Sequence, residues 1–300
     1  NYTSDYNLPY PSVGRWSETK LLNPDTGQME VVSRKYLPSP DDYRNGFYRN
    51  EGDTELFYGT NWQDEIFHTA FSKDYSLTVS GGNDKGSYLY SGGVLDQQGV
   101  IRNSYYKRYT VRANNTRKVN DFIEIGSSIN FSKSDNRLAR TNTENYGVIE
   151  SAISFNPTRP VFDPTADSGF SEDFSTGLAN PYLVVKTEKN VLSSINVNAN
   201  GFAEVTFTPW LKFRQNIGYS YSYYERSQYY NRYTGAGQNP TNGYAVKSDS
   251  NYEGFTEESL LTFNKAFGIH NFNAVAGITY QVANWRSKGM NAKTFATDDT

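Results

Sequence analysis

The sequence predicts an all-β protein, a segment of a large antiparallel transmembrane β-barrel with long extracellular loops and short periplasmic turns. Three observations predict this fold. Apolar and polar residues alternate with a period of two along eight stretches between residues 73 and 282. Short and long links alternate between these stretches, and aromatic residues are frequent, with 25 Tyr and 18 Phe. Alternation of this kind is typical of membrane barrels because only every second residue of a strand faces lipid.

The longest expected strands, at residues 191–208, 211–223 and 272–282, reach the roughly ten residues that a tilted strand needs to cross a membrane. The clearest covers residues 191–208, where Asn198 lies on the polar face. The residues expected to face lipid include Ile195, Val197, Val205, Ile217 and Ile278. The other stretches are residues 75–79, 88–94, 109–113, 123–131, 211–223, 257–265 and 272–282.

Charged residues stand in the middle of the polar faces, among them Arg112, Glu204, Lys212 and Arg214. A water-filled lumen accommodates such residues, whereas a dry core does not. A solvent-facing sheet of a soluble protein would also carry them, so this pattern leaves both interpretations open.

The links between the stretches segregate by length. We expect tight turns on the periplasmic side at residues 83–86, 119–121, 208–210 and 268–271. We expect long links outside the membrane at residues 96–107, 134–190 and 225–254. A soluble sandwich has shorter strands and no reason to place all its long links at one end.

The chain is expected to divide at residue 60. Residues 1–60 contain turn formers at short intervals and are expected to be a loop-rich extracellular segment, with one strand at 29–36. Residues 61–300 are expected to hold the strands and loops of a partial barrel. Within the longest link, residues 143–152 have the pattern of a short helix, which breaks at the Pro-containing residues 156–160.

Composition excludes several functional classes. Lys plus Arg is 29 and Asp plus Glu is 32, so the net charge of −3 does not indicate nucleic-acid binding. The absence of cysteine excludes disulfides and thiolate metal sites, and His68 and His270 are too far apart in sequence to indicate a metal site. Glu257 and Glu258 point to opposite faces of one expected strand, so they are not a catalytic carboxylate pair. We therefore expect no catalytic residue, no cofactor and no metal.

No apolar run approaches the roughly 18 residues of a membrane-spanning helix. The first residues lack the pattern of a signal peptide, and the last three, Asp-Asp-Thr, do not resemble a final barrel strand. We therefore expect that both ends of the natural protein extend beyond this chain.

Several segments together carry a resemblance to a known family. They are residues 61–67 (NWQDEIF), 77–82 (LTVSGG), 93–101 (GVLDQQGVI), 107–114 (KRYTVRAN), 156–162 (NPTRPVF), 180–182 (NPY) and 258–265 (ESLLTFNK). In this order and spacing they resemble the SusC/RagA-like TonB-linked outer-membrane proteins of the Bacteroidetes, the TonB-dependent transporter family. The resemblance covers most of residues 62–282.

The resemblance implies a 22-stranded barrel plugged by an N-terminal domain, located in the cell outer membrane in contact with its lipids. It implies import of oligosaccharides, or of peptides, with a SusD-like surface lipoprotein as partner. It also implies energy from the TonB complex, delivered through an N-terminal part that this chain lacks. The alternative is a secreted all-β domain that binds or cleaves carbohydrate, because such a domain shares the aromatic-rich, helix-poor composition.

The long links 134–190 and 225–254 are expected to meet the substrate and the SusD-like lipoprotein. Tyrosine side chains offer flat faces to sugars, and arginine and asparagine side chains offer hydrogen bonds. The candidate contacts are Tyr229, Tyr230, Tyr233, Arg159, Asn180 and Asn239. Two other interpretations stay open, because the tyrosines also suit an interfacial aromatic girdle and the loops also suit mere shielding of the barrel mouth.

Overall fold

The computed structural model describes residues 15–22, 27–37, 59–141, 147–173, 177–238 and 241–298. They belong to two compact units, one formed by residues 1–66 with 141–184 and the other by residues 67–140 with 185–300.

No helix among the described residues is both long and apolar enough to cross a membrane.

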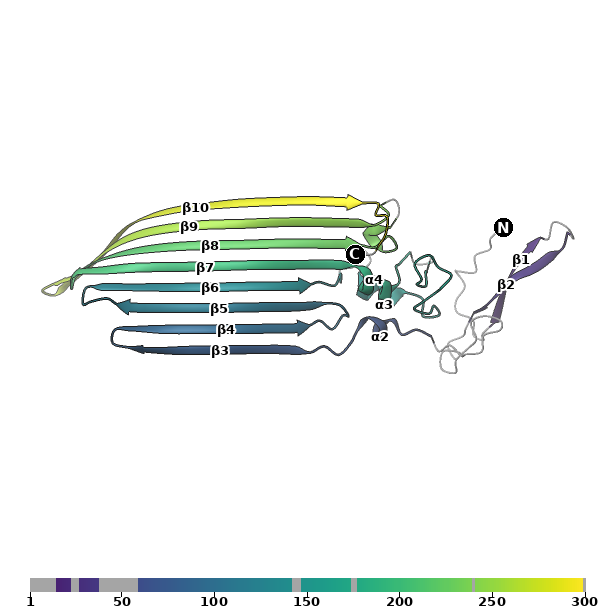
Figure 1. The fold of residues 1–300 in the computed structure, drawn as a ribbon, viewed down its shortest axis with the longest axis horizontal. Coiled ribbons are helices and arrows are strands. Elements are labelled where there is room, and N and C mark those ends of the chain that lie inside the picture. Colours follow the sequence, from purple (N-terminus) through teal and green to yellow (C-terminus); the bar gives the residue numbers. More distant parts are fainter. Residues whose placement is uncertain are drawn as a thin grey trace. The chain divides into compact units, whose positions relative to one another are not determined.

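The second unit is a single antiparallel sheet of eight strands, in which each strand pairs with the next one along the chain. Figure 1 shows the strands side by side, with the tight turns at one end of the sheet and the longer connections at the other. The strands lengthen from 12 residues in the first to 24 in the last two. They are β3 (Ser72–Asn83), β4 (Gly86–Gln98), β5 (Tyr105–Lys118), β6 (Ile123–Arg137), β7 (Lys189–Thr208), β8 (Leu211–Tyr230), β9 (Tyr244–Phe267) and β10 (His270–Lys293).

The pairing register collects most of the apolar residues of the eight strands on one face of the sheet, which also carries Glu253 and Glu257 of β9. Phe131 lies opposite Val197, and Val197 lies opposite Tyr221 on the next strand. This face is also exposed on interior strands: Val111 of β5 is 54% and Ile217 of β8 is 50% accessible. The five residues that we expected to face lipid, Ile195, Val197, Val205, Ile217 and Ile278, all belong to it by register. A soluble monomer rarely exposes an apolar surface that spans a whole sheet.

The apolar face ends in a row of polar residues near the longer connections. Ser193 lies opposite Glu225, which lies opposite Asp249. Ion pairs join Glu225 to Lys247 at 3.0 Å and Asp249 to Lys288 at 3.7 Å. This end of the apolar band therefore coincides with water-accessible charges, as expected where a wall leaves the hydrocarbon.

The opposite face is polar and hollowed. Ser220 donates a hydrogen bond to Asn198 Oδ1 at 3.0 Å, and Ser128 donates to Asn114 Oδ1 at 2.8 Å. A hollow of about 960 Å3 lies on this face. Its polar lining includes Ser80, Asn114, Thr116, Ser128, Asn200, Arg214, Asn216, Ser220, Thr256 and Glu258.

All four expected tight turns are confirmed. Each lies between two consecutive strands that pair with each other. The long link 225–254 is wrong in its bounds: β8 continues to Tyr230 and β9 begins at Tyr244, so the connection covers residues 231–243. The outer parts of these strands carry polar residues on both faces, so they lack the alternation that reveals a strand between lipid and water. The link 96–107 is shorter for the same reason, and the link 134–190 is shortened by only a few residues.

Two further strands, β1 (Arg15–Leu22) and β2 (Met29–Leu37), pair antiparallel. The second strand was expected, and the first was not. Gly27 in the connection has φ +67°, a conformation that glycine adopts without strain. The division of the chain at residue 60 stays a prediction.

Two short helices, α2 (Trp62–Ile66) and α3 (Val148–Ser154), belong to the first unit, and a third, α4 (Pro181–Thr187), begins in the first unit and ends in the second. The Trp62 and Phe155 rings meet edge-on at 4.7 Å, and both residues are buried. Trp62 Nε1 donates to Asn156 O at 3.1 Å, so two segments that carry the family resemblance pack on each other. The helix expected at 143–152 is observed as α3, shifted toward the C-terminus; residues 142–146 lie outside the described residues. The helix α4 was not expected.

Candidate functional site

The described residues of the connection between β8 and β9, 231–238 and 241–243, form a polar and aromatic cluster with residues 294–298 after β10. The cluster lies at the end of the sheet that carries the longer connections. Tyr229, Tyr230 and Tyr233, three of the expected contact residues, lie there. The cluster belongs wholly to the unit that contains the sheet.

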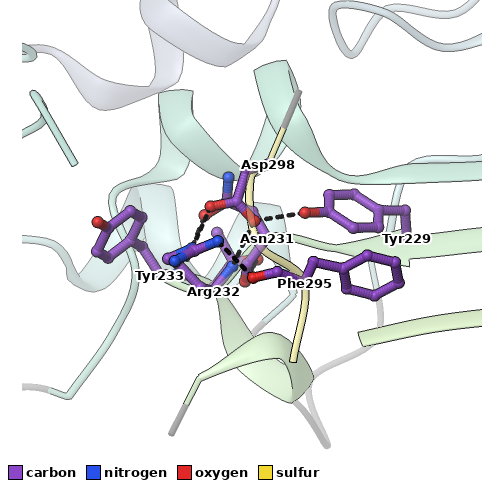
Figure 2. Close-up of polar contacts among 7 residues, drawn as sticks. Tyr229, Asn231, Arg232, Tyr233, Phe295 and Asp298 are labelled. Carbon is purple, nitrogen blue, oxygen red and sulfur yellow. Dashed lines mark hydrogen bonds and ion pairs between the residues drawn. The ribbon is translucent and has the colours of Figure 1, made fainter. Parts of the chain in front are cut away.

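The Asp298 carboxylate is the centre of this cluster (Figure 2). It accepts hydrogen bonds from the Tyr229 hydroxyl and from Arg232 Nε, and the Arg232 backbone N–H adds a contact at 3.4 Å. Arg232 Nη2 donates to Phe295 O at 3.0 Å, and the Phe295 ring meets the Tyr229 ring edge-on at 5.6 Å. Asp298 therefore holds the segment after β10 against the end of β8. The sequence analysis did not identify Asp298, because the residues it joins are up to 69 positions apart.

A compact turn follows β8. Asn231 Oδ1 accepts a hydrogen bond from the Tyr233 backbone at 2.9 Å, and Asn231 O accepts one from the Thr234 backbone at 2.9 Å. Thr234 is fully buried. A Cβ on Gly237 would lie 2.1 Å from Asn231 O, so this turn requires glycine there. The turn fixes the backbone beside Tyr233, whose side chain is only partly buried.

Tyr230 lies in a row of aromatic and cationic side chains. Its ring is nearly parallel to that of Tyr244, with 6.0 Å between centroids and 16° between planes. The Arg140 guanidinium lies 5.6 Å from the Tyr230 centroid, and Lys293 Nζ lies 5.6 Å from that of Tyr244. Tyr230 Oη accepts a hydrogen bond from Gln228 at 3.0 Å. The cations compete with any ligand that would use these ring faces.

A buried ion pair closes the base of the longest insertion, residues 141–187. Arg140 Nη2 lies 2.7 Å from Glu188 Oε1, and the two side chains are only 12% and 9% exposed. Arg137 Nη2 donates to Glu188 O at 2.9 Å. Burial raises the pKa of the Glu188 carboxyl above its ordinary value, although Arg140 and a hydrogen bond with Thr234 act in the opposite direction. The pair thus connects the insertion's base to the β8–β9 turn.

Asn180, another expected contact residue, is 3% exposed. Its amide nitrogen donates to Val161 O at 3.0 Å and to Ser171 O at 3.1 Å. Its Oδ1 accepts from the backbone N–H groups of Tyr182 at 3.0 Å and Leu183 at 3.3 Å, which caps the first turn of α4. These contacts order the insertion, and a ligand role of Asn180 stays a prediction.

Arg159 lies in the same unit as Asn180. Its carbonyl oxygen accepts a hydrogen bond from the Thr60 hydroxyl at 2.6 Å, and its backbone N–H donates to Asn156 O at 3.1 Å. Asn239 lies outside the described residues. The three tyrosines therefore lie in the cluster at the end of the sheet, whereas Arg159 and Asn180 lie in the other unit. The ligand role of all of them stays a prediction.

Among the residues that the structure describes, no group of three or more His, Asp or Glu side chains is placed to hold a metal ion.

No family model matches the chain. The TonB-dependent receptor P3 of Formosa agariphila is 27% identical over 246 residues, which is 80% of this chain and 24% of that protein. The TonB-dependent receptor SusC of Bacteroides thetaiotaomicron is 27% identical over 186 residues, which is 54% of this chain and 18% of that protein. The predicted resemblance to the SusC/RagA-like TonB-linked proteins is confirmed.

Solved structures agree on the fold of the SusC/RagA-like proteins. The RagAB peptide importer in its open-open state superimposes with a TM-score of 0.65 at 20% identity, over 86% of this chain and 28% of the other. The RagAB peptide transporter superimposes with a TM-score of 0.64 at 20% identity. The chain thus spans about a quarter of the length of the SusC/RagA-like proteins it matches, and its sheet is a segment of their barrel wall. The matched relatives are TonB-dependent receptors and transporters rather than enzymes.

Proposed function

We propose that this chain is part of a TonB-dependent importer in the outer membrane that takes up oligosaccharides, or peptides, together with a SusD-like surface lipoprotein. One observation carries the proposal: an eight-stranded sheet with an exposed apolar band on one face and a hollowed polar surface on the other. Such a sheet suits lipid on one side and a water-filled lumen on the other. The TonB complex would act through a part of the full-length protein outside this chain.

The longer connections support a SusD-like partner at their end of the sheet. They leave the sheet at the end opposite the tight turns, which we place in the periplasm (Figure 1). The β8–β9 turn and the base of the insertion 141–187 are held by hydrogen bonds and by the Arg140–Glu188 ion pair. Loops ordered in this way offer a defined surface to a lipoprotein that closes over the barrel.

The second candidate function, a secreted carbohydrate-binding or carbohydrate-cleaving domain, requires its sheet to bury the apolar face against another layer. In the described part of the chain this face stays exposed along all eight strands. Exposure of such an apolar surface to water would be unfavourable for a soluble domain, whereas a membrane importer would place it in lipid. The importer therefore explains this face better.

The test uses the full-length protein in its native host. The importer predicts that the protein sediments with the outer membrane and that its gel migration changes on heating, as expected of a folded barrel. Deletion of its gene should abolish growth on one nutrient, and a SusD-like lipoprotein should copurify with the affinity-tagged protein. Recovery of the protein in the culture medium, without migration change on heating, would instead support the secreted domain.

A further inference from the structure

The polar face of the sheet carries an aromatic corner formed by Tyr252 of β9 and Trp285 of β10. The two residues are directly opposite in the register, and their rings meet edge-on with centroids 5.7 Å apart and planes at 65°. Trp285 is 75% exposed on β10, the edge strand of the described sheet. Because Tyr252 is in register with Ser222, the corner points to the same side as the hollow and away from the apolar band.

A glycine beneath Tyr252 lets its ring lie along the wall. A Cβ on Gly254 would stand 2.6 Å from Tyr252 Oη and 3.1 Å from its Cζ. Residues opposite Gly254 are small on both sides, Ser220 on β8 and Ala283 on β10. The Tyr252 ring and the exposed Trp285 ring therefore form two sides of an open corner with a low floor.

Hydrogen-bonding groups lie at the level of this corner on β7, which β8 separates from β9. Tyr224 donates to Asn196 Oδ1 at 3.2 Å, and Ser220 donates to Asn198 Oδ1 at 3.0 Å. Both asparagines thus use their carbonyl oxygens within the wall, and none of the described residues accepts a hydrogen bond from their amide nitrogens. These N–H groups, at the level of the corner, can donate to hydroxyl oxygens of a ligand.

The residues of this face that surround the corner carry no charge, so the surface offered to a ligand there is neutral; they are Ser220, Ser222, Tyr224, Ser250, Gly254, Ala283 and Ser287. Charged residues of the same face lie farther along the strands. Arg214 Nη1 lies 3.6 Å from Glu204 and its Nε donates to Asn216 at 2.9 Å. Asn216 in turn donates to Glu258 at 2.9 Å. Aromatic faces beside neutral amide and hydroxyl groups match the C–H faces and hydroxyl edges of a sugar ring.

We propose that Tyr252 and Trp285 form a subsite on the lumen wall that stacks on a sugar ring of a neutral oligosaccharide. The subsite is distinct from Tyr229 and Tyr230 at the end of β8: the Tyr229 hydroxyl is bound to Asp298, and the Tyr230 ring lies against Arg140 and Tyr244. This inference rests on the importer function proposed above and adds the chemistry of its ligand.

The test begins with deletion of the full-length gene in the native host and growth on neutral glycans, uronate-containing glycans and peptides. Loss of growth on one nutrient establishes import and identifies the ligand. The full-length variants Trp285→Ala and Tyr252→Ala are then compared with wild type in uptake of that nutrient, labelled, at a limiting concentration. If the nutrient is a neutral glycan, each variant should lower uptake roughly two- to tenfold, the worth of one aromatic contact. Trp285→Phe should restore most of it.

Tyr280→Ala is the matched control, because Tyr280 is an exposed aromatic residue on the apolar face of the same strand. It should leave uptake unchanged at equal surface level, which antibody labelling of intact cells measures. A peptide or uronate glycan as the nutrient, or full uptake by Trp285→Ala, overturns the subsite while import stands. If the deletion impairs growth on none of the nutrients, the importer function is overturned, and the subsite with it.

Discussion

Arginine at Val197 tests the assignment of the two faces of the sheet. Val197 lies on the apolar face of β7 between Phe131 and Tyr221. Four residues separate it from Ser193, where the same face becomes polar, which is about 13 Å of strand at roughly 3.3 Å per residue. With a strand tilt of about 40°, this length corresponds to a depth of about 10 Å in an apolar band roughly 25 Å tall. Val197 therefore lies near the middle of the band.

At that depth an arginine side chain costs roughly 2–4 kcal/mol of barrel stability, because its guanidinium loses its hydration in lipid. The same substitution at Asn198 places the charge on the polar face, next to Ser220. It should cost less than about 1 kcal/mol, since water still reaches the side chain. The two variants differ by one position and carry the same new residue, so they form a matched pair.

The assay is reversible unfolding of the full-length protein in phospholipid vesicles, followed by urea titration with tryptophan fluorescence. We expect Val197→Arg to lower the free energy of unfolding by the stated amount and Asn198→Arg to change it little. Equal losses at both positions, or a larger loss at Asn198, would refute the assignment of the faces.

Three further predictions concern the ends of the sheet. Asp84→Cys in the β3–β4 turn should resist an impermeant thiol reagent in intact cells and react after the outer membrane is opened; ready labelling of intact cells would reverse the orientation. Asp298→Asn should increase amide hydrogen exchange in residues 231–243, because the Tyr229 and Arg232 contacts weaken, and unchanged exchange there would contradict the role of this carboxylate. Glu188 has a folded-state pKa above its unfolded value. Its protonated form therefore stabilises the folded state, fully so below the unfolded pKa. This contribution disappears as pH rises through the folded pKa. The stability of wild type relative to Glu188→Gln, measured by urea titration at several pH values, should therefore fall as pH rises, and a relative stability that grows with pH would exclude this sign.

The sequence by itself was sufficient for the strands and their faces where the wall separates an apolar from a polar environment. Within this band, successive residues of β7 face opposite sides, so Val197 faces lipid and Asn198 faces water. Apolar and polar residues therefore alternate, and this local period of two predicts the strand and its faces. The tight turns were predictable for a similar reason, since Asn, Asp, Gly and Pro form them through local backbone preferences. The family resemblance rested on the order of short segments and did not require the fold.

Only the tertiary structure decided where the strands end and what the candidate side chains do. Beyond the band both faces of β8 and β9 meet water, so the pattern fades although pairing continues to Tyr230 and Tyr244. Asp298 meets Tyr229 from 69 residues away, and the Tyr252–Trp285 corner depends on the register of two strands. Contacts between residues far apart in sequence are set by register and loop packing, which no local period encodes, and for this reason the loop cluster and the aromatic corner emerged only from the assembled sheet.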